Sequence, residues 1–132
     1  MATFAETVDD FLEAYWQHDP VEATHVGVRA HDDRFPDPGP DAAAEWRDTL
    51  ETFADRFESF ETEALTDDER LDQRWALAVI EKLRIDHEER RWAREPRYYL
   101  DDIGTGYHDL LLGEFADLET RLESLTARLR AT

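Results

Sequence analysis

Apolar residues recur at helical spacing from the first residues of the chain onward. Thr3 and Glu6 have the separation of a capping box, and the apolar residues that follow share one helical face: Val8, Phe11, Leu12, Tyr15 and Trp16. Asp19-Pro20 is typical of the end of one helix and the start of another, with Asp19 as the N-cap. Gly27 ends this second segment. The pattern predicts two helices before residue 28.

The middle of the chain begins with a proline-rich loop. Residues 28–40 (VRAHDDRFPDPGP) contain three prolines and a glycine, which cannot continue a helix. Asp41 is the predicted cap of the next helix. Its apolar residues follow one another at intervals of four and three, which indicates a helix packed against other helices: Trp46, Leu50, Phe53, Phe57 and Phe60.

A second capping box opens a longer helix. Thr66 and Glu69 have the required spacing, and the segment WALAVI (75–80) is apolar nearly all round. We therefore expect this helix to be the most buried element. Its sequence becomes charged beyond Arg84. Because a proline disfavours helical backbone at the residue before it, we expect the helix to end at Glu95, before Pro96.

The C-terminal third carries one further apolar row. Gly104 and Gly106 are expected to interrupt the segment 98–112, whose three leucines at 110–112 need burial. A last helix is predicted from Glu114, with a 3-4-3-4 apolar spacing: Phe115, Leu118, Leu122, Leu125 and Leu129. Because this row continues almost to Thr132 without a capping glycine or proline, we expect the chain to continue in a longer protein or residues 1–132 to be a fragment.

The fold class follows from these patterns. No strand-like alternation of convincing length occurs, and the chain has no internal repeat. We predict an all-α bundle of about five helices with a Pro-rich loop. Residues 1–132 form either a single helical domain or the N-terminal part of a larger helical fold.

Charge excludes several classes of partner. With 33 acidic and 15 basic side chains the formal net charge is −18, which repels nucleic acid and anionic membranes. A hydrophobic content of 41% is nevertheless enough for a folded core. The chain has no cysteine, so a disulfide scaffold, a thiol nucleophile and a Cys-based zinc site are excluded. The first eleven residues contain three acidic residues and lack the pattern of a secretory signal, so we expect a cytoplasmic protein.

Candidate chemistry is sparse. No histidine has a ligand-type residue four positions on within a continuous predicted helix, so we expect no metal site, no catalytic residue and no cofactor in this chain. The densest polar group in irregular structure is formed by His31, Asp32, Asp33 and Arg34. These residues either contribute to a cleft or stiffen the Pro-rich loop through an Asp–Arg pair and bonds to the backbone, and the second interpretation is favoured.

Three stretches of the chain, taken in order, resemble the domain-of-unknown-function 885 family. In residues 19–37, D-P-V-E-A-T-H-V-G-V and H-D-D-R-F-P-D resemble its opening pattern, P-x-x-A-T-x-x-G followed by D-x-R-x-x-D. R-L-D-Q-R-W-A-L (70–77) is similar to the first long helix of the family. R-E-P-R-Y-Y-L (94–100) and G-E-F-A-D-L-E-T-R-L-E-S-L-T-A-R-L (113–129) resemble its next landmark.

The resemblance implies a place in a larger protein. Family members are mostly helical, several times longer, and resemble zinc metallopeptidases through an H-E-x-x-P-G-H-like motif far downstream, in which two histidines hold zinc and the glutamate activates water. This chain ends before that motif. We therefore expect the inactive N-terminal helical region of a zinc-dependent peptidase-like protein, with zinc only in a full-length member. Its partner would be the remainder of the chain, or a second copy bound through the apolar helix rows. The alternative is a stand-alone acidic helical bundle that binds a protein.

Lysine is nearly absent beside the many carboxylates, which has two explanations. A GC-rich genome replaces lysine by arginine without physical consequence. A cell with molar internal salt, the favoured explanation, selects both low lysine and high acidity, because salt screens the self-repulsion of the carboxylates.

Salt dependence of stability distinguishes these two explanations. The Debye length falls from about 10 Å at 0.1 M to about 3 Å at 1 M salt, which relieves repulsion among the carboxylates. We expect the melting temperature of the chain, followed by circular dichroism, to rise clearly between these two concentrations of KCl. An unchanged melting temperature would favour the explanation that a GC-rich genome has replaced lysine by arginine.

Overall fold

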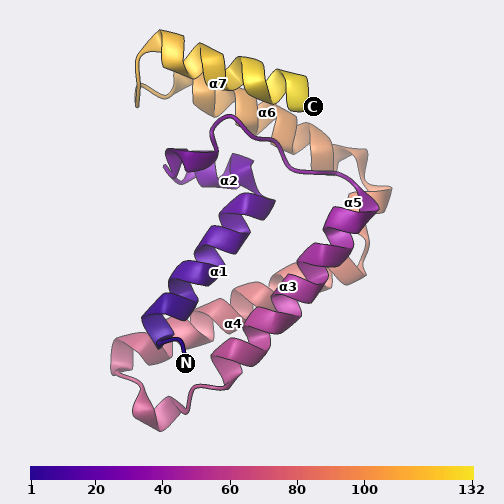
Figure 1. Cartoon of the computed structure of the whole chain (residues 1–132). Helices are drawn as coiled ribbons and strands as arrows, with labels where there is room; N and C mark the ends of the chain where they lie inside the picture. The colour runs from indigo at the N-terminus through magenta and orange to yellow at the C-terminus, as the bar shows by residue number, and fades with distance from the viewer. The chain divides into compact units, whose positions relative to one another are not determined.

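A computed structural model describes the backbone of residues 1–132 and all side chains except those of Trp92 and Tyr98. The described backbone is helical and contains no strand, which confirms the predicted all-α class (Figure 1). The α-helices are α1 (Phe4–His18), α2 (Pro20–His25), α3 (Pro40–Glu58), α4 (Asp67–Glu88), α5 (Arg91–Arg94), α6 (Pro96–Leu112) and α7 (Leu118–Ala131). Two short 3-10 turns, η1 (Arg29–His31) and η2 (Thr62–Ala64), lie in the connections.

The side-chain caps predicted from the sequence set the starts of three helices. The predicted capping boxes are confirmed: the N–H of Thr3 donates to Glu6 Oε2 at 2.7 Å, and that of Thr66 donates to Glu69 Oε2 at 2.8 Å. Each threonine hydroxyl accepts the glutamate N–H in return, at 3.3 Å. Asp19 caps α2 as predicted, with its Oδ1 accepting the N–H three residues on at 2.9 Å. These reciprocal bonds satisfy donors that the first helical turn leaves without partners.

Three helix boundaries differ from the prediction. Helix α3 begins at Pro40, and its cap is Gly39, two residues before the predicted cap Asp41, because the fixed φ of proline suits the first helical position. Helix α4 ends at Glu88, well before Glu95, and the chain turns where Arg90 adopts a φ of 53°. Helix α7 begins at Leu118 and not at Glu114, because the Asp117 side chain accepts the Thr120 N–H at 2.8 Å.

The chain divides into two compact units, which are described separately. Unit 1 comprises Met1–Ala14 and Gly39–Arg91, and contains most of α1 together with α3 and α4. Unit 2 comprises Tyr15–Pro38 and Trp92–Thr132, and contains α2, α6 and α7.

Unit 1 is built around phenylalanines. Phe4 and Phe11 of α1 meet Phe53, Phe57 and Phe60 edge-to-face, with ring centroids 5.4–5.9 Å apart. Four of these five side chains are buried, and Phe60 is half-buried. Edge-to-face contacts place the positive edge of one ring against the negative face of another. The apolar row predicted along α3 therefore lies in the core.

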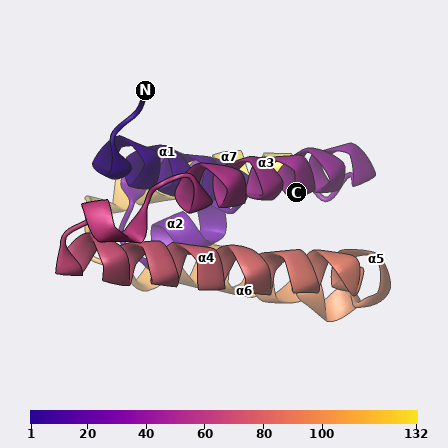
Figure 2. The same ribbon diagram turned by 90° about the horizontal axis from the view of Figure 1, so that it is seen from below.

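A polar side chain joins α3 to α4 inside unit 1. The two helices pack along one another (Figure 2). The buried Gln73 amide donates to the carbonyl of Phe57 at 2.8 Å and to that of Phe60 at 3.1 Å. The Phe57 carbonyl lies in the last turn of α3, where helical partners are missing, and the Phe60 carbonyl lies two residues beyond the helix. Gln73 thus supplies the bonds that the end of α3 lacks.

The prediction that α4 is the most buried element is wrong. Its buried positions are Gln73, Ala76 and Ile80, whereas Trp75 of the WALAVI segment is 51% exposed. The exposed apolar residues share one face of the helix and are called the α4 stripe: Leu71, Trp75 and Ile85. A helix that is apolar nearly all round needs neighbours on every side, and unit 1 covers only one side of α4.

In unit 2, α6 packs against both α2 and α7. Figure 1 shows α6 and α7 side by side. Gly104 and Gly106 do not interrupt α6, contrary to the prediction. A Cβ at Gly106 would lie 3.1 Å from a methyl carbon of Val21, so the missing side chain permits close packing of α2 on α6. This close approach compensates for the low helical propensity of glycine.

The turn between α6 and α7 is fastened by Arg121. Its guanidinium donates to the carbonyls of Ala116 at 3.0 Å and Leu111 at 2.9 Å. Of the three leucines that end α6, Leu110 is buried, while Leu111 and Leu112 are exposed. The expected burial is therefore found for only one of them. No helix in the described part of the chain is long and apolar enough to cross a membrane.

Candidate functional site

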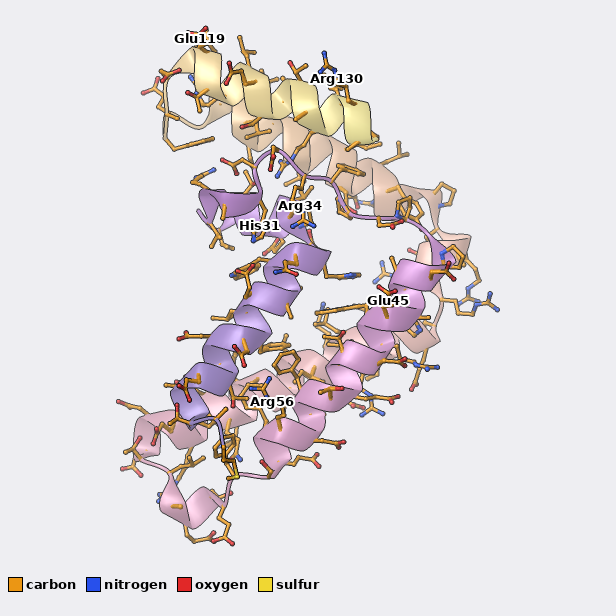
Figure 3. All side chains as sticks on the ribbon, viewed as in Figure 1. His31, Arg34, Glu45, Arg56, Glu119 and Arg130 are labelled. Carbon is orange, nitrogen blue, oxygen red and sulfur yellow. The ribbon has the colours of Figure 1, made fainter. Side chains whose placement is uncertain are left out.

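The polar loop singled out in the sequence lies against α2. Gly27, at a φ of 96°, reverses the chain after α2, and the Val28 N–H donates to the carbonyl of Ala23 at 2.8 Å. Glycine adopts this left-handed conformation without steric cost. The reversal carries Asp32 back to Thr24, whose hydroxyl donates to Asp32 Oδ1 at 2.7 Å. Figure 3 shows His31 and Arg34 on this returning segment.

Arg128 of α7 is the centre of the polar cluster in unit 2. Its side chain is fully buried. Nε donates to the carbonyl of Arg34 at 2.8 Å, Nη1 to that of Gly106 at 2.8 Å, and Nη2 to that of Pro20 at 3.0 Å. Nη2 also donates to Thr24 Oγ1. One guanidinium therefore bonds α2, α6 and the Pro-rich loop, using the fork of donors that arginine alone provides.

The Thr24 hydroxyl bridges the buried guanidinium of Arg128 and the buried carboxyl group of Asp32. The hydroxyl oxygen accepts from Arg128, and the hydroxyl hydrogen is directed at Asp32. Asp32 is buried, and Arg29 Nη1 approaches its Oδ1 at 3.8 Å. Burial lowers the pKa of Arg128, whereas the negative charge of Asp32 raises it. Arginine stays protonated at any physiological pH, so the cluster holds a compensated charge inside unit 2.

The structure separates the four predicted loop residues into two pairs. His31 and Asp32 are buried, and the His31 carbonyl lies 3.4 Å from Arg128 Nη2. Asp33 and Arg34 are exposed, and Arg34 contributes its main-chain carbonyl to the cluster. Arg34 Nη1 also lies 3.4 Å from His31 Nδ1. The contacts hold the loop in place, and participation in a cleft stays a prediction.

Sequence reasoning missed Arg128 and Thr24. Arg128 lies between Leu125 and Leu129 of the predicted apolar row and belongs to no motif that would mark it. Its acceptors are mostly main-chain carbonyls, which every residue carries, so no residue type signals them. Thr24 was noticed only within the string that resembles the family opening. The structure explains that string, because Pro20 begins α2, Ala23 is buried, and Thr24 bonds both charged groups.

Comparison with known proteins identifies the family. A family model described as "Bacterial protein of unknown function (DUF885)" matches residues 20–132. The chain belongs to the DUF885 family. A search of curated proteins gives no match.

A solved structure has the same fold as this DUF885 chain. It is described as that of a putative lipoprotein of unknown function from Shewanella oneidensis, with a TM-score of 0.87 and 23% sequence identity. The match covers 98% of the present chain and 23% of that chain, so the DUF885 chain spans about a quarter of the length of its solved relative. Both matches are to proteins of unknown function, and zinc peptidase activity therefore remains a proposal.

The histidines of the DUF885 chain do not assemble a metal site in the described part of the structure. His25 Nδ1 lies 2.9 Å from Asp109 Oδ2, and His108 Nδ1 lies 3.3 Å from Asp109 Oδ1. The hydrogen bond to Asp109 raises the pKa of His25. Among the described side chains, no three His, Asp or Glu residues converge as a metal site requires.

Asp102 of α6 lies near Asp19, the cap of α2. Burial and the carboxylates of Asp19 and Asp101 raise the pKa of Asp102 to about 7. Burial also raises the pKa of Asp19 itself. Because burial first, and the neighbouring carboxylates second, disfavour ionisation of Asp102, this group is partly protonated near neutral pH.

Replacement of Arg128 tests the cluster. We expect Arg128→Met to destabilise the chain by about 3 kcal/mol or more, because carbonyls from three segments lose a charged donor while remaining buried. Arg128→Lys should recover only part of the loss, since an ammonium lacks the planar fork. Urea unfolding followed by circular dichroism measures both effects. The matched control is Arg130→Met, an exposed position on the same helix. Equal midpoints for Arg128→Met and Arg130→Met would contradict the assigned role.

The raised pKa of Asp102 predicts a pH dependence with a definite sign. The folded state binds this proton more tightly than the unfolded state, so the contribution of Asp102 to stability falls as pH rises from about 4 to about 7. We expect Asp102→Asn to be more stable than the parent chain by roughly 1–2 kcal/mol at pH 8, after allowance for solvent screening, and by less at pH 5. Urea unfolding at both pH values measures the difference. Asp72→Asn, an exposed change of equal charge, is the control, and an equal gain from it would attribute the effect to net charge alone.

Proposed function

We propose that this DUF885 chain is the N-terminal helical region of a longer peptidase-like protein, in which it builds part of the scaffold and supplies no catalytic residue. The observation that carries the proposal is the structural match, in which nearly the whole chain overlays about a quarter of a longer protein. A region that has the same fold within a longer polypeptide is suited to serve as part of the scaffold of that polypeptide.

The polar groups of unit 2 favour a scaffold role. The guanidinium of Arg128, the Thr24 hydroxyl and the Asp32 carboxylate bond one another or the main chain. Catalytic groups need atoms directed toward a substrate, whereas these are directed into the protein. Peptide hydrolysis at a zinc ion is proposed for the remainder of the protein, where the resemblance implies the H-E-x-x-P-G-H-like motif.

Exposed apolar faces also support membership in a larger fold. The α4 stripe of unit 1 leaves Leu71, Trp75 and Ile85 in solvent. On α7 of unit 2, Leu118 is 57% exposed, Leu122 42% and Leu129 54%, and these three residues are called the α7 stripe. Exposed rows of apolar residues on one helix face favour contact with further protein. The second candidate function, a stand-alone module that binds a protein, rests on the same two stripes.

The cellular location belongs to the proposal as well. A cytoplasmic protein, as expected from the sequence, is proposed. The solved relative is described as a putative lipoprotein, which makes an exported protein the alternative.

Metal analysis and a peptidase assay test the proposed function. The longer natural protein and the 1–132 chain are purified without chelator, dialysed, and analysed for zinc and for cleavage of a fluorogenic peptide mixture. We expect zinc near one equivalent and peptide cleavage for the longer protein, and neither for residues 1–132, because the described side chains form no metal-ligand cluster.

Two results would overturn this assignment. Zinc retained by residues 1–132 after dialysis would place a metal site in this chain. A longer protein that holds no zinc and cleaves no peptide would remove the hydrolase part of the proposal, leaving the binding module as the favoured function.

A further inference from the structure

The outer face of α7 forms an open groove. It has a volume of about 710 Å³ and is lined by Leu118, Leu122, Thr126 and Ala127, with Glu119, Glu123 and Arg130. Figure 3 shows Glu119 and Arg130 on the side of α7 that faces away from α6. Every lining residue comes from this one helix. The set of lining residues is called the α7 groove.

The form of the groove argues against a small-molecule site. Such sites are concave and bring a few polar groups together from several elements around a mostly enclosed ligand. Here a single helix provides the whole surface, and its two leucines, Leu118 and Leu122, lie one helical turn apart. A surface of this shape matches the apolar face of another helix.

Charge restricts what lies on this surface. Glu119 and Glu123 are one helical turn apart and lie beside the α7 stripe, with Arg130 two turns beyond Glu123. A second copy of this chain, with a net charge of −18, would bring further carboxylates against them. A helix with apolar residues for the stripe and a lysine or arginine facing the two glutamates is complementary.

The structural comparison indicates where such a helix comes from. The chain covers 23% of its solved relative, so about three quarters of that protein lie outside the matched part. We propose that the α7 groove seats an amphipathic helix of the same polypeptide, from the part outside residues 1–132, which covers the α7 stripe and pairs a basic side chain with Glu119 and Glu123. This inference rests on the proposed function, since it requires the chain to be part of a longer protein.

Thiol labelling tests the occupant of the groove. The 1–132 sequence has no cysteine, so Leu122→Cys places one thiol in the groove, and Glu58→Cys places a control thiol at an exposed position of α3. Each variant is prepared in residues 1–132 and in the longer natural protein. Labelling by N-ethylmaleimide, an uncharged reagent, is quantified at that position by peptide mass spectrometry, and rates are expressed relative to the denatured protein.

We expect a difference between the two lengths of chain at position 122 only. In residues 1–132 both thiols should react within about twofold of their denatured rates, whereas in the longer protein the thiol at 122 should react on the order of tenfold more slowly. Adding Glu119→Gln and Glu123→Gln should restore part of that reactivity, because the basic partner loses its acidic counterparts. Thr126→Cys, on the same face, replaces Leu122→Cys if that variant of the longer protein does not fold.

Other outcomes overturn the proposal. Fast labelling at 122 or 126 in the longer protein would show that the groove is open. Protection that develops in residues 1–132 as concentration rises, together with a dimer in sedimentation, would identify a second copy as the occupant. The zinc and peptidase measurements are independent of labelling, so a protected thiol without zinc refutes only the proposed hydrolase, and zinc with an unprotected thiol refutes only this inference.

Discussion

The guanidinium of Arg128 takes the place of water for main-chain carbonyls that belong to three separate segments of unit 2. Burying an isolated charge is costly, and it is tolerated here because Pro20, Gly106 and Arg34 provide carbonyl acceptors within 3.0 Å. Thr24 links the same cation to the buried Asp32. The packing of α2, the course of the Pro-rich loop and the position of α7 on α6 all depend on this group. Gly106 contributes by leaving room for α2 to approach.

Other long polar side chains serve helix ends in the same way. Gln73 bonds carbonyls at and just beyond the end of α3 in unit 1, and Arg121 bonds carbonyls at the turn after α6 in unit 2. In each case the side chain provides donors where the helix leaves acceptors without partners. The two units nevertheless differ in character, since unit 1 is built on edge-to-face phenylalanines and unit 2 on a charged centre.

In this chain the buried polar side chains bond the chain's own backbone and one another, whereas the α4 and α7 stripes are exposed to solvent. That combination favours the proposed scaffold role, because the polar groups of an enzyme site face a ligand. Membership of the DUF885 family and the match to one quarter of a longer protein give the stripes a physical explanation. Under the proposed function, the α4 and α7 stripes are the surfaces that further helices of a longer polypeptide would cover.

The sequence by itself determined the all-α class, the caps of α1, α2 and α4, and the phenylalanine row of α3, because caps and helical periodicity depend on residues close together in the chain. It also located the His31–Arg34 loop, without distinguishing its buried pair from its exposed pair. The continuity of α6 through two glycines, the exposure of Trp75 and the role of Arg128 were decided by tertiary structure. The physical reason is that these three features depend on contacts between distant segments. A buried arginine whose acceptors are mostly carbonyls has the same sequence pattern as one that faces water.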